Sequence, residues 1–212
     1  MACEESGRVR EAFARRGHNA WSCDLEPTAI PGQHRQGDVL EFLEETGDDY
    51  WDLMIAHPVC RYLANSGAKH LYKGMKKENG ENPERFKLMR KGAKFYLALR
   101  NRKIKRRAIE NPVMHGHAME IIKPGHRQFI QPWQFGHKEM KATGLELINL
   151  PDLVPTNVVG PPPADAEERR KWQVVWLMGP GPDREKLRSR TYEGVAEAMA
   201  SQWGPLLPGD RG

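Results

Sequence analysis

Cysteine is scarce in this chain, and long hydrophobic runs are absent. The three cysteines, Cys3, Cys23 and Cys60, are far apart and form no C-x-x-C pair. An odd number of scattered thiols argues against a disulfide framework and against a zinc site, and it fits a reducing cytoplasm. No apolar run approaches the roughly 20 residues that a membrane-spanning helix needs, and the first residues lack the basic and apolar segments of a secretory signal. We therefore expect no membrane, no metal and a cytoplasmic location.

Acidic residues are fewer than basic ones, and the difference is local. The 33 Lys and Arg residues exceed the 28 Asp and Glu residues, which gives a net charge of +5. The basic residues gather in three clusters: 100–107; Lys73, Lys76 and Lys77; and Lys87, Arg90, Lys91 and Lys94. Such clusters suit a polyanion, but they are equally compatible with a solvated face that keeps the protein soluble. Composition alone leaves both interpretations open.

The pattern of apolar residues predicts strands that alternate with helices. At 212 residues the chain can form one sizeable core and is marginal for two. We predict strands at 19–25, 52–56, 108–109, 128–130 and 145–150. We predict helices at 7–16, 38–45, 83–99 and 191–202. This alternation indicates an α/β fold with a mainly parallel sheet and helices on both faces.

The segment 151–190 has a different composition from the rest. It contains three consecutive prolines at 161–163 and Gly-Pro-Gly-Pro at 179–182, with a charged stretch between them. We predict an irregular excursion there, with a strand pair around Trp172 to Met178. Loops of this length are usually functional or mobile. The chain therefore divides into a core at 1–150, an irregular Pro- and Gly-rich insertion at 151–190, and a C-terminal helix with its tail at 191–212.

The thiol of Cys60 is a candidate catalytic group. The apolar run at 52–56 predicts a buried strand, and Pro58 ends it because proline has no N–H to donate to a neighbouring strand. Cys60 then lies just past the carboxyl end of a central strand, where open α/β sheets bind ligands. The alternative is that Cys60 is a small packed hydrophobic residue. Glu110 and Asn111 follow another predicted strand and would face the same pocket.

Three other features occur in the order that a nucleotide-type ligand site needs. Gly7 opens a helix, and a small residue there lets the backbone approach a ligand, although turns also need glycine. Asp24 ends the next predicted strand, where a carboxylate can hold the two hydroxyls of a ribose or simply be solvated. Asp38 would accept a hydrogen bond from an adenine amino group or N-cap the following helix, and the two roles are compatible.

Together these motifs resemble those of the cytosine-C5 DNA methyltransferases, most closely the short versions carried by bacteriophages and prophages. The family's helix-opening motif F-S-G-x-G-G corresponds to 5–10, its two acidic residues to Asp24 and Asp38, its P-P-C loop to 58–60 and its E-N-V motif to 110–112. The segments 131–137 and 188–199 are also similar to the phage branch. The resemblance therefore extends over nearly the whole chain, to about Gly204.

The resemblance implies a Rossmann-like, S-adenosylmethionine-dependent methyltransferase fold, DNA as the partner and the cytoplasm of a bacterial host. Cys60 would be the covalent nucleophile. Glu110 would be protonated or share a proton, and it would hold N3 and the exocyclic amine of cytosine. Asn111 would position the loop that carries Glu110. The cofactor-binding residues would be Cys3, Glu5, Ser6, Gly7, Asp24, Leu25, Asp38, Val39 and Pro58. The candidates for substrate binding are Arg61, Lys138 and Lys141. We expect a monomer or a weak dimer.

The chain departs from the family pattern at several positions. Arg8 and Arg10 replace two glycines of the first loop, Val59 replaces the second proline of the nucleophile loop, and only Met1 to Cys3 precede the first turn. No segment is long enough for a separate target-recognition domain, and the insertion at 151–190 is the only candidate for a reduced recognition region. We therefore expect weak or very short sequence specificity. Two alternatives remain open: an enzyme that modifies a free cytosine nucleotide, and a catalytically inactive copy that binds DNA or the cofactor.

Overall fold

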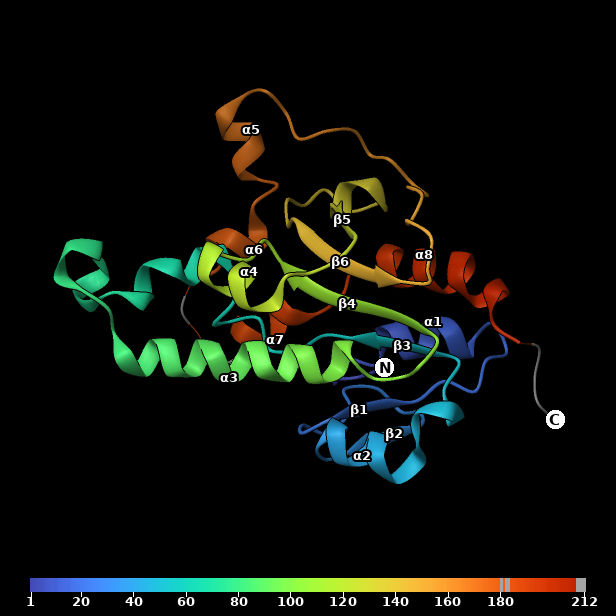
Figure 1. Cartoon of the computed structure of the whole chain (residues 1–212). Helices are drawn as coiled ribbons and strands as arrows, with labels where there is room; N and C mark the ends of the chain where they lie inside the picture. Colours follow the sequence, from blue (N-terminus) through green and yellow to red (C-terminus); the bar gives the residue numbers. More distant parts are fainter. Residues whose placement is uncertain (180, 182–183, 209–212) are drawn as a thin grey trace.

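The structure, a computed structural model (Figure 1), describes residues 1–179, 181 and 184–208. Its strands are β1 (Ser22–Asp24), β2 (His34–Gln36), β3 (Leu53–Ala56), β4 (Arg106–Pro112), β5 (Arg127–Ile130) and β6 (Thr143–Ile148). Its α-helices are α1 (Arg8–Ala14), α2 (Val39–Thr46), α3 (Pro83–Arg100), α4 (Gly116–Ile122), α5 (Ala166–Arg170), α6 (Val174–Leu177), α7 (Arg184–Ser189) and α8 (Glu193–Trp203). Parts of the predicted insertion (180 and 182–183) and tail (209–212) lie outside the described residues.

The sheet is mixed, which corrects the expectation of a mainly parallel one. β1 pairs with β2, and β3 with β4, in parallel, whereas β6 is antiparallel to both β4 and β5. The chain passes from β5 to β6 without a crossover α-helix. A parallel pair usually needs such a crossover, so this shorter connection leaves the two strands antiparallel.

The first residues of the chain lie at the centre of the sheet. Ala2 forms parallel bridges to Cys23 of β1 and to Ala56 of β3. The strand order is therefore β2, β1, the segment 1–3, β3, β4, β6, β5. The chain starts at the centre, moves outward to β2 and then returns to the other side of its first segment. Where the order of strands reverses in this way, a crevice forms at their carboxyl ends, and open α/β sheets bind ligands there.

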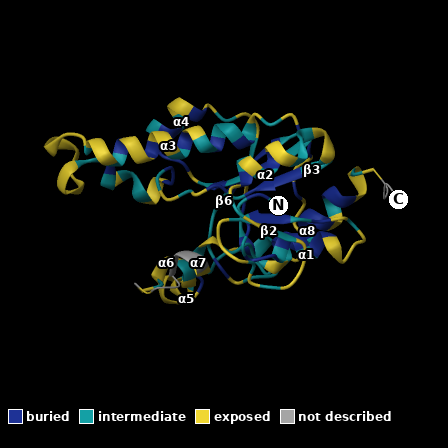
Figure 2. Cartoon of the chain, turned by 90° about the horizontal axis from the view of Figure 1, so that it is seen from below, coloured by how far each residue is buried: buried dark blue, intermediate teal, exposed yellow. Residues whose placement is uncertain are grey.

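Helices cover both faces of the sheet, as expected. Met54 and Ala56 of β3 belong to the core cluster formed with α2, α3 and α4, whereas Ile55 belongs to the cluster formed with α1 and α8. This division follows from strand geometry, since successive side chains point to opposite faces. Figure 2 shows the buried β3 next to helices whose outer surfaces are exposed.

A buried charge network fixes β6 against α3. Glu146 is 1% exposed, and its carboxylate lies 3.0 Å from the Nε of Arg100. It also accepts hydrogen bonds from the hydroxyl of Tyr96 at 2.7 Å and from the N–H of Gly125 at 2.6 Å. A buried carboxylate with several partners holds the elements that carry those partners in place. Losing a partner would leave the charge of the carboxylate unpaired and away from water, which is costly. The network thereby holds the strand that begins at Thr143, beside the candidate site described below.

One local prediction was wrong, and another gave a strand that is too short. The strand pair expected around Trp172 to Met178 is helical, with α6 at Val174–Leu177. Trp172 is buried while Val174, Trp176 and Leu177 are exposed, so no continuous apolar face is available to join a sheet. The strand expected at 108–109 is longer, because β4 pairs with β3 on one side and with β6 on the other.

Candidate active site at the carboxyl edge of the sheet

Cys60 and Glu110 come together from two neighbouring parallel strands. Cys60 follows the carboxyl end of β3, and Glu110 lies in the carboxyl half of β4. Burial raises the pKa of the Cys60 thiol to about 11; the negative charge of Glu110 adds to this effect, and the positive charges of Lys141 and Arg188 oppose it. The thiol is therefore protonated at neutral pH in the free protein, and a partner would need to displace its proton before it acts as a nucleophile.

The raised pKa of Cys60 predicts a distinctive pH profile for alkylation. Because only the thiolate reacts, the rate of modification by iodoacetamide should rise roughly tenfold for each pH unit from neutrality upward, well past the value of about 8.5 at which an ordinary thiol levels off. Peptide mass spectrometry would follow the Cys60 peptide separately, with glutathione as the reference thiol. A plateau in the Cys60 rate below pH 9 would contradict the prediction.

Glu110 interacts with His57, a residue that the sequence analysis did not single out. The Nδ1 of His57 lies 3.6 Å from the Oε2 of Glu110, with the two side chains 9% and 17% exposed. This distance is longer than a hydrogen bond and corresponds to a close electrostatic contact. Burial acts to raise the pKa of the Glu110 carboxyl, but the contact with His57 and the charge of Lys141 outweigh it and lower that pKa. Glu110 is thus ionised in the free protein, and the expected protonated form would have to be produced by a ligand.

The His57–Glu110 pair opens into a small cavity. Its polar lining consists of His57, Glu110, Lys141, Thr143, Ser189, Thr191 and Tyr192. The Nζ of Lys141 donates to the carbonyl of Arg188 at 2.7 Å, which connects the cavity to the segment that precedes α8. Of the three predicted substrate-binding residues, Lys141 therefore lies in the site. Arg61 and Lys138 have exposed side chains and do not line this cavity.

Asn111 does not share the cavity with Glu110. The two residues are consecutive in β4, so their side chains point to opposite faces of the sheet. Asn111 is 3% exposed, and neither atom of its side-chain amide has a hydrogen-bond partner among the described residues. A buried amide without partners is costly, which is consistent with a positioning role whose partner is a ligand or water.

Acidic side chains gather where the order of strands reverses. Burial and the charges of Asp24 and Asp38 raise the pKa of the Cys3 thiol, and burial followed by the charge of Glu5 raises that of the Asp24 carboxyl. Asp24 and Asp38 therefore lie within electrostatic range of Cys3, and Glu5 lies within electrostatic range of Asp24. Asp38 also N-caps α2, with its carboxylate accepting from the N–H of Leu40 at 2.7 Å. The capping role considered for Asp38 is thus confirmed.

The other predicted cofactor residues are less uniform in position. Leu25 is 71% exposed, whereas Val39 is 5% exposed and packs in the core. Pro58 is buried directly after β3. The hydroxyl of Ser6 donates to the buried carboxylate of Glu4. The Glu4 carboxylate also accepts hydrogen bonds from the N–H groups of Val9 and Arg10. Glu4 therefore caps the amino-terminal end of α1.

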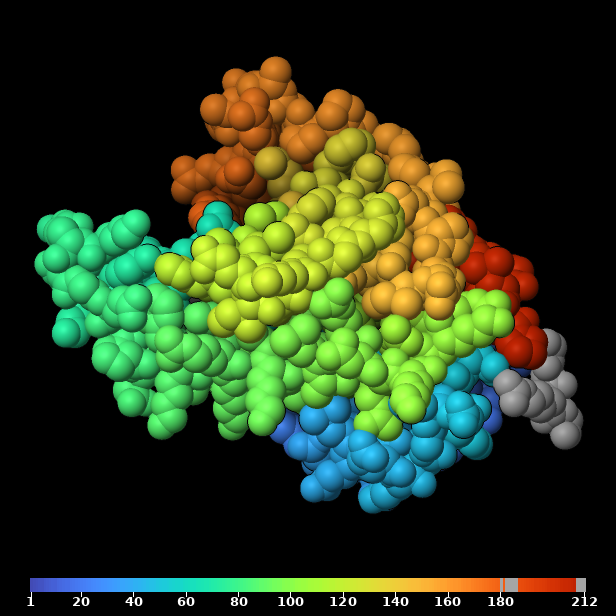
Figure 3. All heavy atoms as spheres, in the orientation of Figure 1, coloured from blue at the N-terminus to red at the C-terminus, as the bar shows by residue number. Residues whose placement is uncertain are grey.

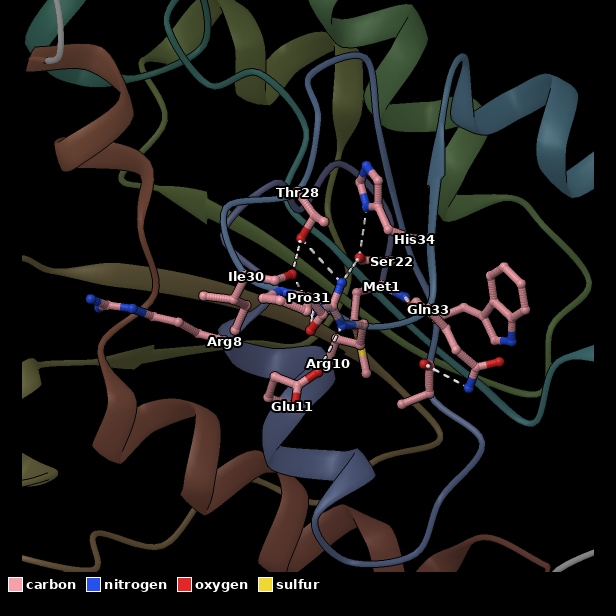
Figure 4. A network of polar contacts seen from close by, with 12 residues as sticks. Met1, Arg8, Arg10, Glu11, Ser22, Thr28, Ile30, Pro31, Gln33 and His34 are labelled. Atoms are coloured by element: carbon pink, nitrogen blue, oxygen red, sulfur yellow. Dashed lines mark hydrogen bonds and ion pairs between the residues drawn. The ribbon is translucent and has the colours of Figure 1, made fainter.

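The guanidinium of Arg10 fills the turn between β1 and β2. Its side chain is fully buried and lies 3.0 Å from the carboxylate of Glu11. It donates, at 2.8 to 3.1 Å, to the hydroxyls of Ser22 and Thr28 and to the carbonyls of Ile30 and Pro31. Figure 4 shows the guanidinium pointing into the turn formed by these residues. Arg10 thus joins α1, β1 and the β1–β2 connection.

Gly7 is required by the chain itself as well as by any ligand. Its φ of +67° is in the left-handed region, and a Cβ there would lie 2.6 Å from the Cγ1 of Ile30 and 2.8 Å from a guanidinium nitrogen of Arg10. Both features exclude larger residues.

The sequence analysis missed Glu4, Arg10 and His57 as site residues. The available signals were an acidic residue next to a helix start and a histidine directly after a buried strand.

Comparison with known proteins places the fold in context. The site and sheet define an α/β protein with a ligand crevice at its carboxyl edge. No protein-family profile matches the chain, and no curated protein matches it. A solved structure with a similar fold is that of a prophage-encoded protein of E. coli described as a DNA modification methyltransferase, with 13% identity and a TM-score of 0.46. The similarity covers 74% of this chain and 50% of that one, so it spans about half the length of that protein. A likeness this weak assigns no activity.

Within the described part of the chain, no helix is both long enough and apolar enough to cross a membrane. The same residues contain no group of three or more His, Cys, Asp and Glu side chains arranged to hold a metal ion.

Proposed function

We propose that this protein is an S-adenosylmethionine-dependent methyltransferase with a Rossmann-like fold that acts on C5 of cytosine in DNA. The observation that carries the proposal is that Cys60 and Glu110 lie at the carboxyl ends of neighbouring parallel strands, where the charge of Glu110 acts on the Cys60 thiol. This pair lies next to the reversal in strand order and its acidic side chains. A nucleophile beside a carboxylate is the combination that activation of a cytosine ring requires.

The donor set at the reversal of strand order fits S-adenosylmethionine. Asp24 and Asp38 provide carboxylates near Cys3, and Glu5 lies near Asp24. Carboxylates suit the ribose hydroxyls and the cationic groups of this cofactor. We assign Asp24 to the ribose hydroxyls and Asp38 to the adenine amino group. When bound, S-adenosylmethionine supplies an electrophilic methyl group. The remaining predicted residues, Cys3, Ser6, Gly7, Leu25, Val39 and Pro58, stay predictions.

The chain's own residues would activate the base. The Cys60 thiolate forms a bond to C6 of cytosine, and the electrons of the C5–C6 double bond move to C5, which becomes nucleophilic. In its protonated form, Glu110 donates a hydrogen bond to N3 and accepts one from the exocyclic amine, which stabilises the charge that the addition places on the ring. Once C5 carries its methyl group, loss of the C5 proton to a base restores the double bond and releases the thiolate. A cytosine in a duplex would first be flipped out, at a cost of a few kcal/mol.

The substrate class is tested by transfer of tritiated methyl groups from S-adenosylmethionine to unmethylated duplex DNA, single-stranded DNA and dCMP in parallel. We expect label at C5 of cytosine in DNA, spread over many sequence contexts. Label in dCMP alone would identify the nucleotide enzyme instead. Cofactor binding without transfer to any of the three would identify an inactive copy, and label confined to a single long sequence would contradict weak specificity.

A further inference from the structure

Residues 69–94, which we call the basic arm, carry a larger net positive charge than the chain as a whole. It contains nine Lys and Arg residues and three Glu residues, a net charge of +6. The whole chain has a net charge of +5, so the remaining residues together are slightly negative. The net positive charge is therefore concentrated in the basic arm and in the cluster at 100–107, which has six Lys and Arg residues and no acidic one.

The basic arm extends from the edge of the sheet that holds Cys60. The chain leaves Cys60 and passes through the 3-10 helices η2 (Asn65–Leu71), η3 (Lys73–Met75) and η4 (Lys77–Asn79) before returning along α3. Since α3 leads back to the amino end of β4, its own amino end lies at the carboxyl edge. Figures 1 and 3 show this teal and green segment projecting from the body at the left of the view.

The basic arm is anchored like a folded element. Leu71, Phe86 and Met89 are buried in the core cluster beneath it. Its two sides are joined by a bridge between Tyr72 and Glu81, and the N–H of Asn82 donates to the carbonyl of Leu71 at 2.8 Å. The hydroxyl of Tyr72 lies 3.0 Å from the Nε2 of His117 on α4. These contacts present the charges on a defined surface, which lowers the entropy cost of binding a partner.

The lysines of the basic arm are not neutralised within the protein. Lys73, Lys76, Lys77, Lys87, Lys91 and Lys94 are exposed, and none of them forms an ion pair in the described part of the chain. A face that serves only solubility usually mixes both signs of charge. At the tip, Met75 is 54% exposed between these lysines. Proteins that bind the minor groove often insert an exposed apolar side chain of this kind between bases.

We propose that the basic arm binds the phosphate backbone of DNA next to the base that enters the Cys60 site. The inference rests on the proposed function. It assigns to the basic arm the contacts with DNA that a separate recognition domain would otherwise make. Phosphate contacts determine position and affinity but not sequence. An arm of lysines therefore predicts binding that depends strongly on salt and weakly on sequence, in agreement with the weak specificity expected for this chain.

The test compares two triple variants that remove the same charge. Lys73→Gln/Lys76→Gln/Lys77→Gln neutralises the arm, and Lys103→Gln/Lys105→Gln/Lys123→Gln neutralises exposed lysines near the opposite end of α3. Binding of a fluorescein-labelled duplex is measured by anisotropy over a series of salt concentrations. The arm variant should bind about tenfold more weakly or worse, and its plot of log K against log salt should be flatter by about 2 to 3 than that of the wild type. In the control variant, the loss of affinity and the change in slope should each be less than a third of those in the arm variant.

The outcomes separate the arm from the catalytic proposal. An arm variant with the wild-type slope, or equal losses in both variants, would overturn the role of the arm even if methyl transfer is observed. A loss confined to the arm variant supports it, even if the protein transfers no methyl group. Wild-type protein that does not bind DNA at low salt, or that binds polyglutamate as tightly, would overturn the inference. Thermal melting of both variants verifies that the exposed substitutions leave the fold intact.

Discussion

Replacement of Cys60 by alanine is expected to reduce methyl transfer to cytosine by a factor on the order of 10⁴ or more, because it removes the group that makes C5 nucleophilic. Cys60 lies at the carboxyl edge, where its thiol interacts with Glu110 and Lys141. The same substitution should leave S-adenosylmethionine affinity nearly unchanged, since the acidic residues around Cys3 belong to another part of the crevice. Tritium transfer and equilibrium binding of the cofactor measure the two quantities separately.

Covalent trapping sharpens this prediction. DNA that contains 5-fluorocytosine cannot lose its substituent at C5, so the wild-type protein should form a stable adduct that survives denaturing electrophoresis. Cys60→Ala should form none. Cys23→Ala is the matched control, because Cys23 is a thiol buried in the core and should trap as the wild type does. An adduct that persists in Cys60→Ala, or disappears in Cys23→Ala, would show that the nucleophile has been assigned wrongly.

The second large effect is expected from Arg10→Met, which should lower the free energy of unfolding by about 3–5 kcal/mol. Methionine has a similar length but donates no hydrogen bonds. The substitution therefore leaves the carbonyls of Ile30 and Pro31 and the carboxylate of Glu11 without the guanidinium that now contacts them. Urea denaturation followed by circular dichroism measures the loss. Arg10→Lys should recover only part of it, because an ammonium cannot span the same set of acceptors.

Arg8→Met provides the control for Arg10. Arg8 is on the same helix but half-buried, and its guanidinium donates to the carbonyl of Thr191 at 2.9 Å. We expect a loss of about 1 kcal/mol or less for a single hydrogen bond of this kind. Equal losses in the two variants would mean that Arg10 is not the structural centre of the first loop. The comparison also distinguishes the two arginines of α1, because only Arg10 is expected to be built into the fold.

Much of the local structure could be predicted from the sequence. The regular spacing of Phe86, Met89, Ala93 and Tyr96 predicted the helix that the structure shows as α3, and each of these residues is buried. The apolar run before Pro58 predicted β3 within one residue. These predictions succeed because burial of one helical face, or of a whole strand, leaves a direct trace in the order of apolar and polar residues.

Other features left no such trace. β4 begins with Arg106 and Arg107, and it is stabilised by pairing on both sides. Because these two residues are charged, the apolar pattern predicted only the part of the strand at 108–109. The helical turn of α6 has exposed apolar residues and therefore lacks the polar face by which a helix is predicted. In both cases the deciding contacts come from residues far away along the chain.

The sequence by itself determined the alternation of strands and helices, the position of Cys60 after a buried strand and the concentration of basic residues in 69–94, because each of these is a property of neighbouring residues. Only the tertiary structure decided that β6 runs antiparallel to its neighbours, that His57 faces Glu110, that Lys141 and not Lys138 or Arg61 lines the cavity, and that Arg10 is buried. Each of these features depends on contacts between segments that are far apart along the chain. The free energy of such contacts is set by the burial and charge of the residues that form them, which local sequence does not encode.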